Sequence, residues 1–339
     1  MIDLRNFIEE VRDILKSHNL STPGVYKRWL FQDAEGTRNM DADIYGCADA
    51  ANILYTIGEL PSGQNNNDRN DWISTLQSFQ NEETGLYESE GMSPVHTTAF
   101  AAGALELFDT RPKHPIIGLS EFSKRENLIQ LLESLDWVNN PWVSSHKGAG
   151  IYASMVLTGS VTLEWEDWYF DWLFHNADPD TGLWKNGCIY DGNHNLKGAP
   201  LFHHMASSFH YIFNCEYAKR PIPYAKQIID TCIGMFQNNL YPVFNNTLTY
   251  NEIDFIYLLS HCVKRSGHRF EESQEIIRKI AEPFINYLLL LDNKTDDGIN
   301  DLHNLFAAVS ALAVIQDSVP GLLLTEKPLR LVLDRRPFL

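Results

Sequence analysis

The chain has 339 residues, 44% of them hydrophobic and 12% aromatic, which is enough to fill a large core. Its formal net charge of -17 argues against nucleic-acid binding and against an anionic membrane surface, because both reward clusters of Lys and Arg. The five cysteines form no CxxC pair, and their odd number argues against a disulfide framework, so we expect a cytoplasmic protein with reduced thiols.

The first segment, residues 1–19, has a charged amphipathic helical pattern that is not typical of a signal peptide. No apolar run in the rest of the chain approaches the ~18 residues that a membrane span needs. We therefore expect no integral membrane association. A transient membrane contact stays open as a way to collect an apolar substrate.

Six later segments share one pattern: each begins with polar residues or a histidine and continues with small and apolar residues. They begin at Asp41, His96, Ser145, His203, Asn251 and Asp301, at intervals of about fifty residues. An amphipathic helical pattern precedes each of them. Because a helix that is apolar all round is buried and one with a polar face lies outside, the pattern predicts an all-α fold, the (α/α)6 toroid of six outer–inner helical hairpins. No linker divides the chain, so we expect one domain over residues 1–339.

The loops from outer to inner helix repeat as well. LQSFQNEETGLY (76–87) recurs as FHNADPDTGLW (174–184) and more faintly as FQNNLY (236–241). In these repeats the chain resembles the terpenoid-cyclase and protein-prenyltransferase superfamily of α/α toroids, whose repeats carry Gln, then Gly, then an aromatic residue. The resemblance spans nearly the whole chain and implies the toroid. Since the chain has one domain, it is most similar to single-domain class II terpene cyclases.

Class II cyclases protonate an alkene or epoxide with the aspartate of a DxDDTA motif, and this chain departs from that motif. PVHTTA (94–99) keeps the Thr-Ala ending without the aspartates, and DADI (41–44) lacks the last acid. The family's general acid therefore has no counterpart here, and the acid has to be sought elsewhere.

The N-terminal ends of the six inner helices are expected at one end of the toroid, which we call the mouth. Helix dipoles there favour an anionic group. The polar residues expected at the mouth are Asp41, Asp43, His96, Ser145, His146, Lys147, His203, His204, Glu252, Asp254, Asp301 and His303. No HExxH, CxxC or His pair at i, i+4 occurs at the mouth, so we expect neither a metal nor another cofactor.

Small and apolar residues on all six inner segments predict a cavity along the toroid axis, open at the mouth and closed at the other end. We expect His96, His146, Lys147 and His203 to bind the head of a substrate. The side chains expected along its tail are Tyr45, Phe100, Tyr152 and Trp184.

Asp109 is the first candidate for the proton donor. It lies 13 residues after His96, about 20 Å along a helix, and so at the end opposite the mouth. If it faces inward, burial and the negative end of its helix raise its pKa and keep it protonated. The alternative is an exposed helix stop paired with Arg111 or Lys113. Asp49 and the mouth residue Asp43 are the next candidates.

Three functions follow. The first is a protonation-initiated, class II-type cyclase acting on a linear isoprenoid with an anionic or aryl head. The second is a carbohydrate-active hydrolase, lyase or epimerase that uses Asp41, Asp43, Glu252, Asp254 or Asp301 with a mouth histidine and stacks sugars on Tyr87, Trp142 and Trp184. The third is a non-catalytic toroid that binds a lipid or a protein. A continuous apolar pocket favours the first, a shallow acidic groove the second and a filled interior the third.

Overall fold

The computed structural model describes residues 1–191, 194–242, 247–292 and 295–338. In these residues the chain is mainly helical, and the all-α class is confirmed. Strands are short: β1 (Ile2–Asp3) pairs in parallel with β4 (Leu323–Leu324), and β2 (Ile189–Asp191) pairs antiparallel with β3 (His194–Lys197). The first pair ties the beginning of the chain to a segment more than three hundred residues later.

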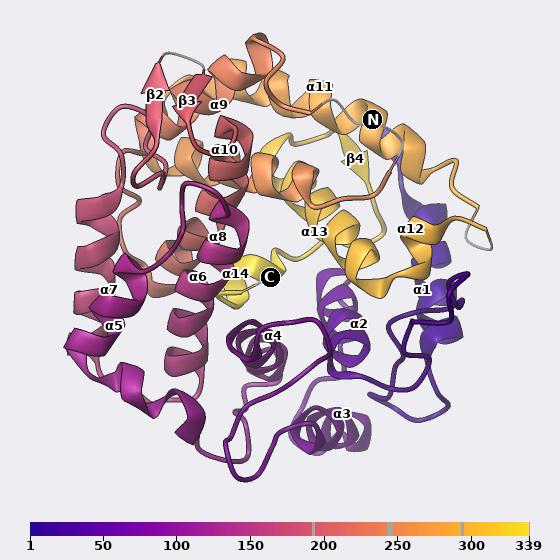
Figure 1. The fold of residues 1–339 in the computed structure, drawn as a ribbon. Coiled ribbons are helices and arrows are strands. Elements are labelled where there is room, and N and C mark those ends of the chain that lie inside the picture. Colours follow the sequence, from indigo (N-terminus) through magenta and orange to yellow (C-terminus); the bar gives the residue numbers. More distant parts are fainter. Residues whose placement is uncertain (192–193, 243–246, 293–294, 339) are drawn as a thin grey trace.

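Six helices, one from each repeat, are buried on nearly all sides, as their apolar pattern predicts. We call them the inner helices: α2 (Ile44–Thr56), α4 (Pro94–Glu106), α6 (Pro141–Leu157), α8 (Leu201–Ala218), α10 (Asn251–Ser266) and α13 (Leu302–Ser318). Each packs against the next in this order, and α13 packs against α2, so the contacts run in a cycle (Figure 1).

An amphipathic helix precedes each inner helix along the chain. These are α1 (Arg5–His18), α3 (Asn67–Ser78), α5 (Arg125–Glu133), α7 (Leu163–Asn176), α9 (Ala225–Gln237) and α11 (Phe270–Leu288). In α1 the buried residues Phe7, Val11 and Ile14 recur at helical spacing, so one stripe faces the core. The remaining short helices are η1 (Ile117–Ser123), α12 (Asp297–Asn300) and α14 (Val332–Arg335).

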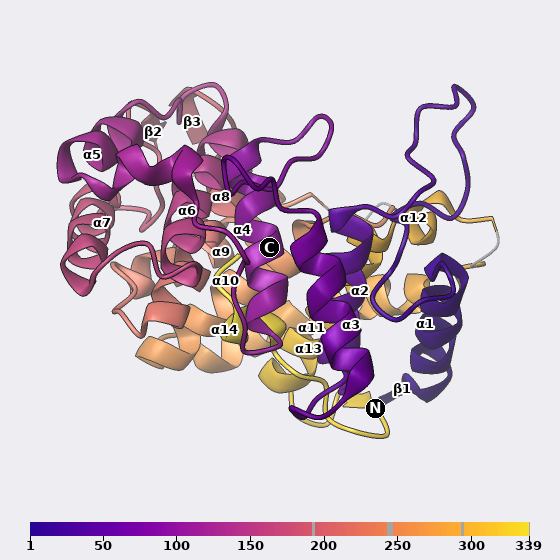
Figure 2. The same ribbon diagram turned by 90° about the horizontal axis from the view of Figure 1, so that it is seen from below.

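The inner helices point the same way. Near their N-terminal ends, Tyr45 of α2 contacts His96 of α4 and His303 of α13. At the opposite end, which we call the floor, Arg335 binds Glu106, the last residue of α4. Loops from the first third of the chain stand out on one side of the helices, while β1 and α14 lie on the other (Figure 2).

The repeated loops form the same turn twice. Gly85 and Gly182 both adopt positive φ, 72° and 77°. The aromatic residue that follows donates its backbone N–H to a hydroxyl of the next inner helix, Tyr87 to Thr98 and Trp184 to Ser208, each at 3.0 Å. Tyr87 and Trp184 are 0% and 1% exposed. The expectation that Trp184 contacts a substrate, and with it sugar stacking on Tyr87, is therefore wrong: both rings pack between helices.

Residues 332–338, which we call the inserted segment, occupy the space between the inner helices (Figure 1). The segment runs from the floor, where Arg335 binds Glu106, to Phe338, whose ring lies 5.0 Å from that of His96. Arg336 and Phe338 have no exposed surface, and neither have Phe100, Phe209 and Phe306 of the inner helices. A side chain without accessible surface touches no water-sized space. The expected open cavity along the axis is therefore wrong at this depth.

Small residues of the inner helices make room for the inserted segment instead of a substrate. A Cβ added at Gly103 of α4 would come within 2.9 Å of the Arg336 guanidinium, and one at Gly150 of α6 within 3.4 Å of the Phe338 ring. Asn214 of α8 donates to the carbonyl of Pro337 at 2.8 Å. The pattern that predicted free space thus serves close packing of the chain on itself.

Candidate functional site

Asp109 does not lie at the end of a cavity. Helix α4 ends at Glu106, and Asp109 follows with a φ of 53° and a side chain that is 84% exposed. Its carboxylate pairs with Arg335 of the inserted segment at 2.5 Å. The expected burial of Asp109 is therefore wrong, because the helix stops before it and an arginine holds its carboxylate at the surface.

Four histidines gather at the mouth and form what we call the histidine cluster: His96, His146, His210 and His303. The ring centroids of His96 and His146 are 4.7 Å apart, and those of His146 and His210 are 4.5 Å apart. Tyr45 links His303 to this group, since its ring lies 5.4 Å from His303 and its hydroxyl is 2.6 Å from Nδ1 of His96. These contacts bring together residues from five inner helices, α2, α4, α6, α8 and α13.

One pair in the cluster joins an acid to an imidazole. Nδ1 of His303 is 2.9 Å from Oδ1 of Asp49, which lies on α2 and has no exposed surface. The other oxygen of Asp49, Oδ2, has no hydrogen-bond partner. Burial raises the pKa of Asp49 well above its usual value and lowers the pKa of His303 to about 3. Both shifts favour the uncharged forms of the pair, a protonated carboxyl group and a neutral imidazole.

The histidine cluster keeps hydrogen-bonding groups unused. Ser145 donates its hydroxyl to the Trp142 carbonyl at 2.8 Å, so it accepts at 2.9 Å from Nδ1 of His210. That assigns the proton of His210 to Nδ1 and leaves Nε2 as an acceptor. Among the described residues no partner is found for Nε2 of His210 or His303, or for either ring nitrogen of His146.

Burial keeps these imidazoles neutral. It lowers the pKa of His96 and His210 to about 3 and that of His146 well below its usual value, with neighbouring histidines adding to the effect. A neutral imidazole can both donate and accept a hydrogen bond, which suits hydroxyl groups better than it suits anions. The histidine cluster therefore does not supply the cationic histidines that an anionic head group would need.

Two cavities at the mouth flank the histidine cluster. The polar cavity, of about 520 Å³, is lined by Arg28, Trp29, Asp33, Thr37, Arg38, Asn39, Asp43, Tyr45, Ser89 and Glu90. The aromatic cavity, of about 450 Å³, is lined by Trp142, Phe202, His203, Ala206, Leu248, Thr249, Tyr250, Asn251 and Asn304. Tyr45 contacts the cluster from the first, and Trp142 and Tyr250 contact it from the second.

The charged groups of the polar cavity are ordered by ion pairs. Arg28 donates two hydrogen bonds of 2.7 Å to Asp301, and its guanidinium lies 4.8 Å from the Trp29 ring. Asp43 caps α2 by accepting from the Gly46 N–H at 2.7 Å. Burial raises the pKa of Asp43 to about 6, so this carboxyl group gains and loses a proton close to neutral pH. Such a pKa suits a general acid or base.

The other predicted substrate contacts divide into two groups. His203 lines the aromatic cavity, and Tyr45 and His146 belong to the mouth, but Lys147 is exposed and lines neither cavity. The expectation for Tyr152 is wrong, because its hydroxyl donates to Glu166 of α7 at 2.7 Å and its ring stacks on Tyr169. Phe100 faces the axis but is packed against Arg336 and Tyr45, so it has no open space beside it.

The acids of the carbohydrate hypothesis also differ in their surroundings. Asp41 is exposed, and Asp301 is bound to Arg28. Glu252 and Asp254 are buried in the first turn of α10; burial raises the pKa of Glu252 to about 7 and that of Asp254 well above its usual value. Both carboxyl oxygens of Asp254 lack a partner. Of the five acids in this hypothesis, Asp43 lines the polar cavity.

Sequence reasoning missed His210, Arg28 and Arg336. His210 follows His203 by seven residues, two helical turns on the same face, and this spacing was available in the sequence. Arg28 and Arg336 gave no such signal, because each lies outside the repeats and reaches the site only through a long-range contact, with Asp301 and Asn52 respectively.

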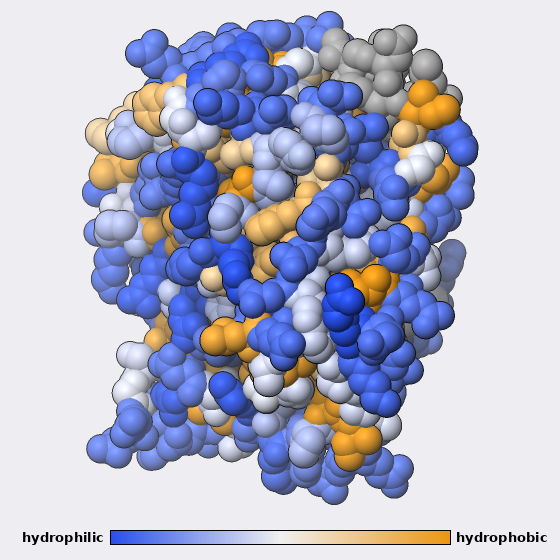
Figure 3. Space-filling model, turned by 90° about the vertical axis from the view of Figure 1, so that its left-hand side faces the viewer, coloured by the Kyte–Doolittle hydropathy of each residue, from blue (hydrophilic) through white to orange (hydrophobic). Residues whose placement is uncertain are grey.

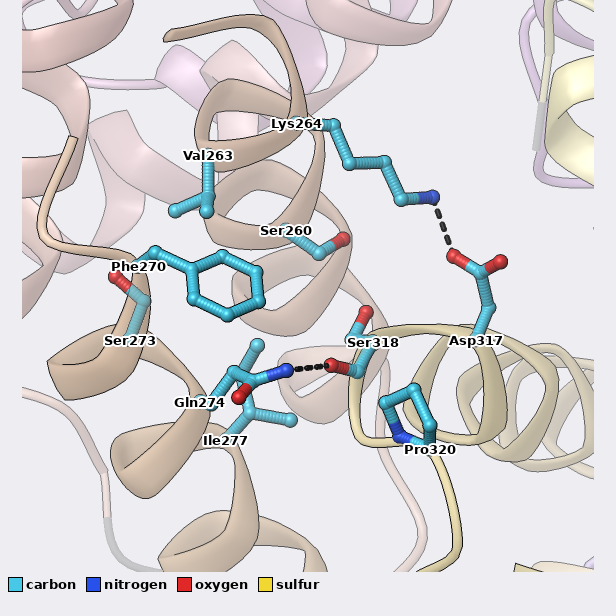
Figure 4. Close-up of a pocket in the computed structure, with 10 residues that line it drawn as sticks. All are labelled: Ser260, Val263, Lys264, Phe270, Ser273, Gln274, Ile277, Asp317, Ser318 and Pro320. Carbon is cyan, nitrogen blue, oxygen red and sulfur yellow. Dashed lines mark hydrogen bonds and ion pairs between the residues drawn. The ribbon is translucent and has the colours of Figure 1, made fainter. Parts of the chain in front are cut away.

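Away from the mouth, the described surface offers less chemistry. A small pocket of about 120 Å³ lies at the floor between α10, α11 and α13, where Lys264 pairs with Asp317 and Gln274 donates to the Ser318 carbonyl (Figure 4). The face on the α5 and α7 side is mainly hydrophilic, with scattered hydrophobic patches (Figure 3). Asp49 and Asp254, the buried acids with unpartnered carboxyl oxygens among the described residues, lie on inner helices α2 and α10.

Within the described ranges, no three His, Cys, Asp or Glu side chains are arranged to hold a metal ion. No helix in that part of the chain is both long and apolar enough to cross a membrane. The chain matches no protein-family model, no curated protein and no solved structure.

Proposed function

We propose that the chain is a carbohydrate-active enzyme on an (α/α)6 toroid, acting by acid–base catalysis at the mouth without a cofactor. The cyclic contacts of the inner helices support the toroid. The observation that carries the function is the polar cavity, which brings Asp43, with a pKa of about 6, next to Tyr45 and the histidine cluster.

The Asp49–His303 pair acts as the acid in this proposal, and Asp43 acts as the base. His303 donates the proton on Nε2 to the leaving oxygen of the substrate, and Asp49 restores a proton to Nδ1. Asp43 acts as the base that accepts a proton from water or from a substrate carbon. Neutral imidazoles bind sugar hydroxyls, and Trp142, which lines the aromatic cavity, provides a ring for a sugar face.

The packing of the interior weighs against the cyclase that threads its substrate down the axis. A carbocation needs a dry site of the length of its substrate. The interior between the inner helices is filled by Arg336 and Phe338, and the polar cavity is open to water. A cyclisation along the axis therefore has no room in this conformation.

A protonation-initiated cyclase stays as the second candidate because of Asp49. This carboxyl group is buried near Tyr45, its Oδ2 is unpartnered and its pKa is raised, as an alkene-protonating acid requires. The isoprenoid would then lie in the aromatic cavity, and Asp49 would be the proton donor, the role first expected for Asp109. A toroid that binds a ligand without turnover is the third.

The test is a product assay on two substrate panels. The purified protein is incubated with neutral, amino and acidic oligosaccharides, and separately with prenylated aryl carboxylates, and products are identified by mass spectrometry. We expect turnover in the first panel, falling about 10²–10⁴-fold in His303→Gln and in Asp43→Asn. His175→Gln, at an exposed histidine of the outer helix α7, is the matched control and should keep full activity.

Cyclised products from the second panel, lost in Asp49→Asn, would replace this proposal with the cyclase. Binding in either panel without any product would leave the non-catalytic toroid.

A further inference from the structure

Arg336 is a buried cation with unused hydrogen-bonding capacity. Its side chain has no exposed surface and lies 4.8 Å from the Phe100 ring. Nε donates to the Phe338 carbonyl at 2.7 Å and Nη1 donates to Oδ1 of Asn52 at 2.6 Å. Nη2 has no partner. Burial lowers the pKa of Arg336 only to about 9, so the guanidinium stays charged at neutral pH.

The unpartnered Nη2 belongs to a group of three such atoms. Asn52 lies three residues after Asp49 on α2, so the two side chains share a face of the helix about 4.5 Å apart along its axis. Nδ2 of Asn52 and Oδ2 of Asp49 are both buried without a partner, like Nη2 of Arg336. Buried polar atoms are nearly always paired, so an acceptor and two donors left over together require an explanation.

We propose that Arg336 supplies the counter-charge for the Asp49 carboxylate that forms when the Asp49–His303 pair gives up its proton. This inference rests on the proposed acid–base role of that pair. Arg336 touches no substrate, so it is a positioning residue. It acts on the new carboxylate through its charge, which favours the ionised form of Asp49.

The proton balance shows why a counter-charge is needed. The resting pair has a protonated carboxyl group and a neutral imidazole, so it carries no charge. When His303 gives the proton on Nε2 to the substrate, Nδ1 takes the carboxyl proton of Asp49. One proton has left, and Asp49 carries a negative charge on a side chain that has no exposed surface. A buried charge of this kind is costly unless an opposite charge is close to it.

Two described cations favour the Asp49 carboxylate, Arg28 more strongly than Arg336. Arg28 is already paired, because its Nε and Nη2 donate to Asp301, whereas Arg336 has no acidic partner among the described residues. The remaining titratable groups around Asp49 are acidic or neutral. They are Asp43 and Tyr45 on α2, His96 on α4, Tyr250 on α10, and Asp301 and His303 on α13.

The inserted segment fixes Arg336 from both sides. Before it, Asp334 accepts a hydrogen bond of 2.8 Å from Nε2 of His261 on α10. After it, the Pro337 carbonyl accepts from Asn214 on α8. The missing side chain at Gly103 lets the guanidinium lie against α4. This support holds a charge at the floor side of a site whose substrate enters from the mouth.

The experiment compares Arg336→Gln with the matched control Arg335→Gln. Arg335 binds Glu106 and Asp109 at the floor surface, so Arg335→Gln removes a charge away from Asp49. Nitrogen-15 NMR of the His303 ring, assigned with His303→Gln, follows the loss of the proton from the pair as the pH is raised. We expect Arg336→Gln to raise the pKa of the pair by about one unit or more. Arg335→Gln should leave it unchanged, and Arg336→Lys should restore part of the shift.

Kinetics give an independent measurement. Arg336→Gln should lower kcat about tenfold or more, with KM unchanged, and move the basic limb of the pH–rate profile to higher pH. Equal NMR titrations of Arg336→Gln and Arg335→Gln would overturn the inference. If Arg336→Gln does not fold, Asp49→Asn replaces it as the test variant. Asp49→Asn should shift the NMR signal of the Arg336 Nε–H group and leave that of Arg335 unchanged. An unchanged Arg336 signal would overturn the inference.

The outcomes separate this inference from the proposed function. A raised pKa of the pair without turnover of any carbohydrate would refute the function and keep the role of Arg336. Turnover of a carbohydrate, with the pKa of the Asp49–His303 pair unchanged in Arg336→Gln, would support the function and refute the role of Arg336.

Discussion

The mouth and the floor each contain a histidine bound to an aspartate, and the pKa of the aspartate is raised in one pair and lowered in the other. At the mouth, His303 binds Asp49, which has no exposed surface, a raised pKa and one unpartnered oxygen. At the floor, His261 binds Asp334, whose side chain is 35% exposed and which also accepts from Tyr257. Although burial opposes it, the hydrogen bond from His261 lowers the pKa of Asp334.

The difference shows how the same residue types can serve catalysis or stability. The floor pairs its charges: Arg335 with Glu106, Arg265 with Glu216 and Lys264 with Asp317. Near the mouth, carboxyl oxygens of the buried acids Asp49 and Asp254 have no partner among the described residues. Unpaired buried carboxyl groups reduce stability, so the two at the mouth, beside the histidine cluster, favour that end as the functional one.

The largest expected effect separates the two histidines by activity. His303→Gln should reduce turnover about 10²–10⁴-fold, because it removes the proton donor. His261→Gln should leave kcat per folded molecule close to that of the wild type and instead lower the free energy of unfolding. Turnover corrected for the folded fraction, with unfolding followed in urea, makes the comparison. Equal loss of turnover in both variants would remove the functional difference between the two ends.

The next effect is the acid sensitivity that the histidine cluster causes. Burial lowers the pKa of His96, His210 and His303 from 6.5 to about 3, so protons bind first to the unfolded chain. The stability that these neutral histidines contribute is present above pH 6.5 and is lost as the pH falls toward 3. Each contributes up to about 1.4 kcal/mol per pH unit in that window.

Urea unfolding at pH 7 and pH 5 measures this slope. His210→Gln should make it shallower, whereas His175→Gln, at an exposed histidine, should not change it. A slope that is the same in both variants contradicts the assignment of buried neutral histidines to the mouth.

A smaller effect tests the packing of the inserted segment. Alanine normally stabilises a helix relative to glycine, but Gly103→Ala should destabilise the protein by about 1–3 kcal/mol, because its Cβ would come within 2.9 Å of Arg336. Gly150→Ala should cost less, since its new Cβ would have its nearest contact at 3.2 Å, with Val95. Thermal unfolding compares the two. A stabilised Gly103→Ala would mean that the inserted segment does not occupy this place.

The smallest effect is expected at Asp109. Asp109→Asn removes one exposed ion pair with Arg335, and such pairs contribute about 0–1 kcal/mol. Turnover and the free energy of unfolding should both stay near those of the wild type. A loss of turnover comparable to that of His303→Gln would return the proton donor to the floor.

The sequence by itself determined the helical fold class, the six repeats and the polar residues that begin each inner helix. These depend on local periodicity, so helix formation and burial follow from residues three and four positions apart. The same local signal placed His96, His146 and His303 near one another, because helices that point the same way bring their first turns together. The Gly85 and Gly182 turns both have a glycine at positive φ, as the repeated Thr-Gly-Leu-aromatic motif predicts.

Only the tertiary structure decided what fills the space between the inner helices. Small residues on every inner helix indicated a cavity, but a sequence pattern cannot distinguish room for a ligand from room for another part of the same chain. The inserted segment takes that room, binds Asp109 at the surface through Arg335 and brings Arg336 beside Asn52, 284 residues away in the chain. The pKa values of Asp49 and Asp43 depend on the burial that results, so they follow from the assembled structure and not from local sequence.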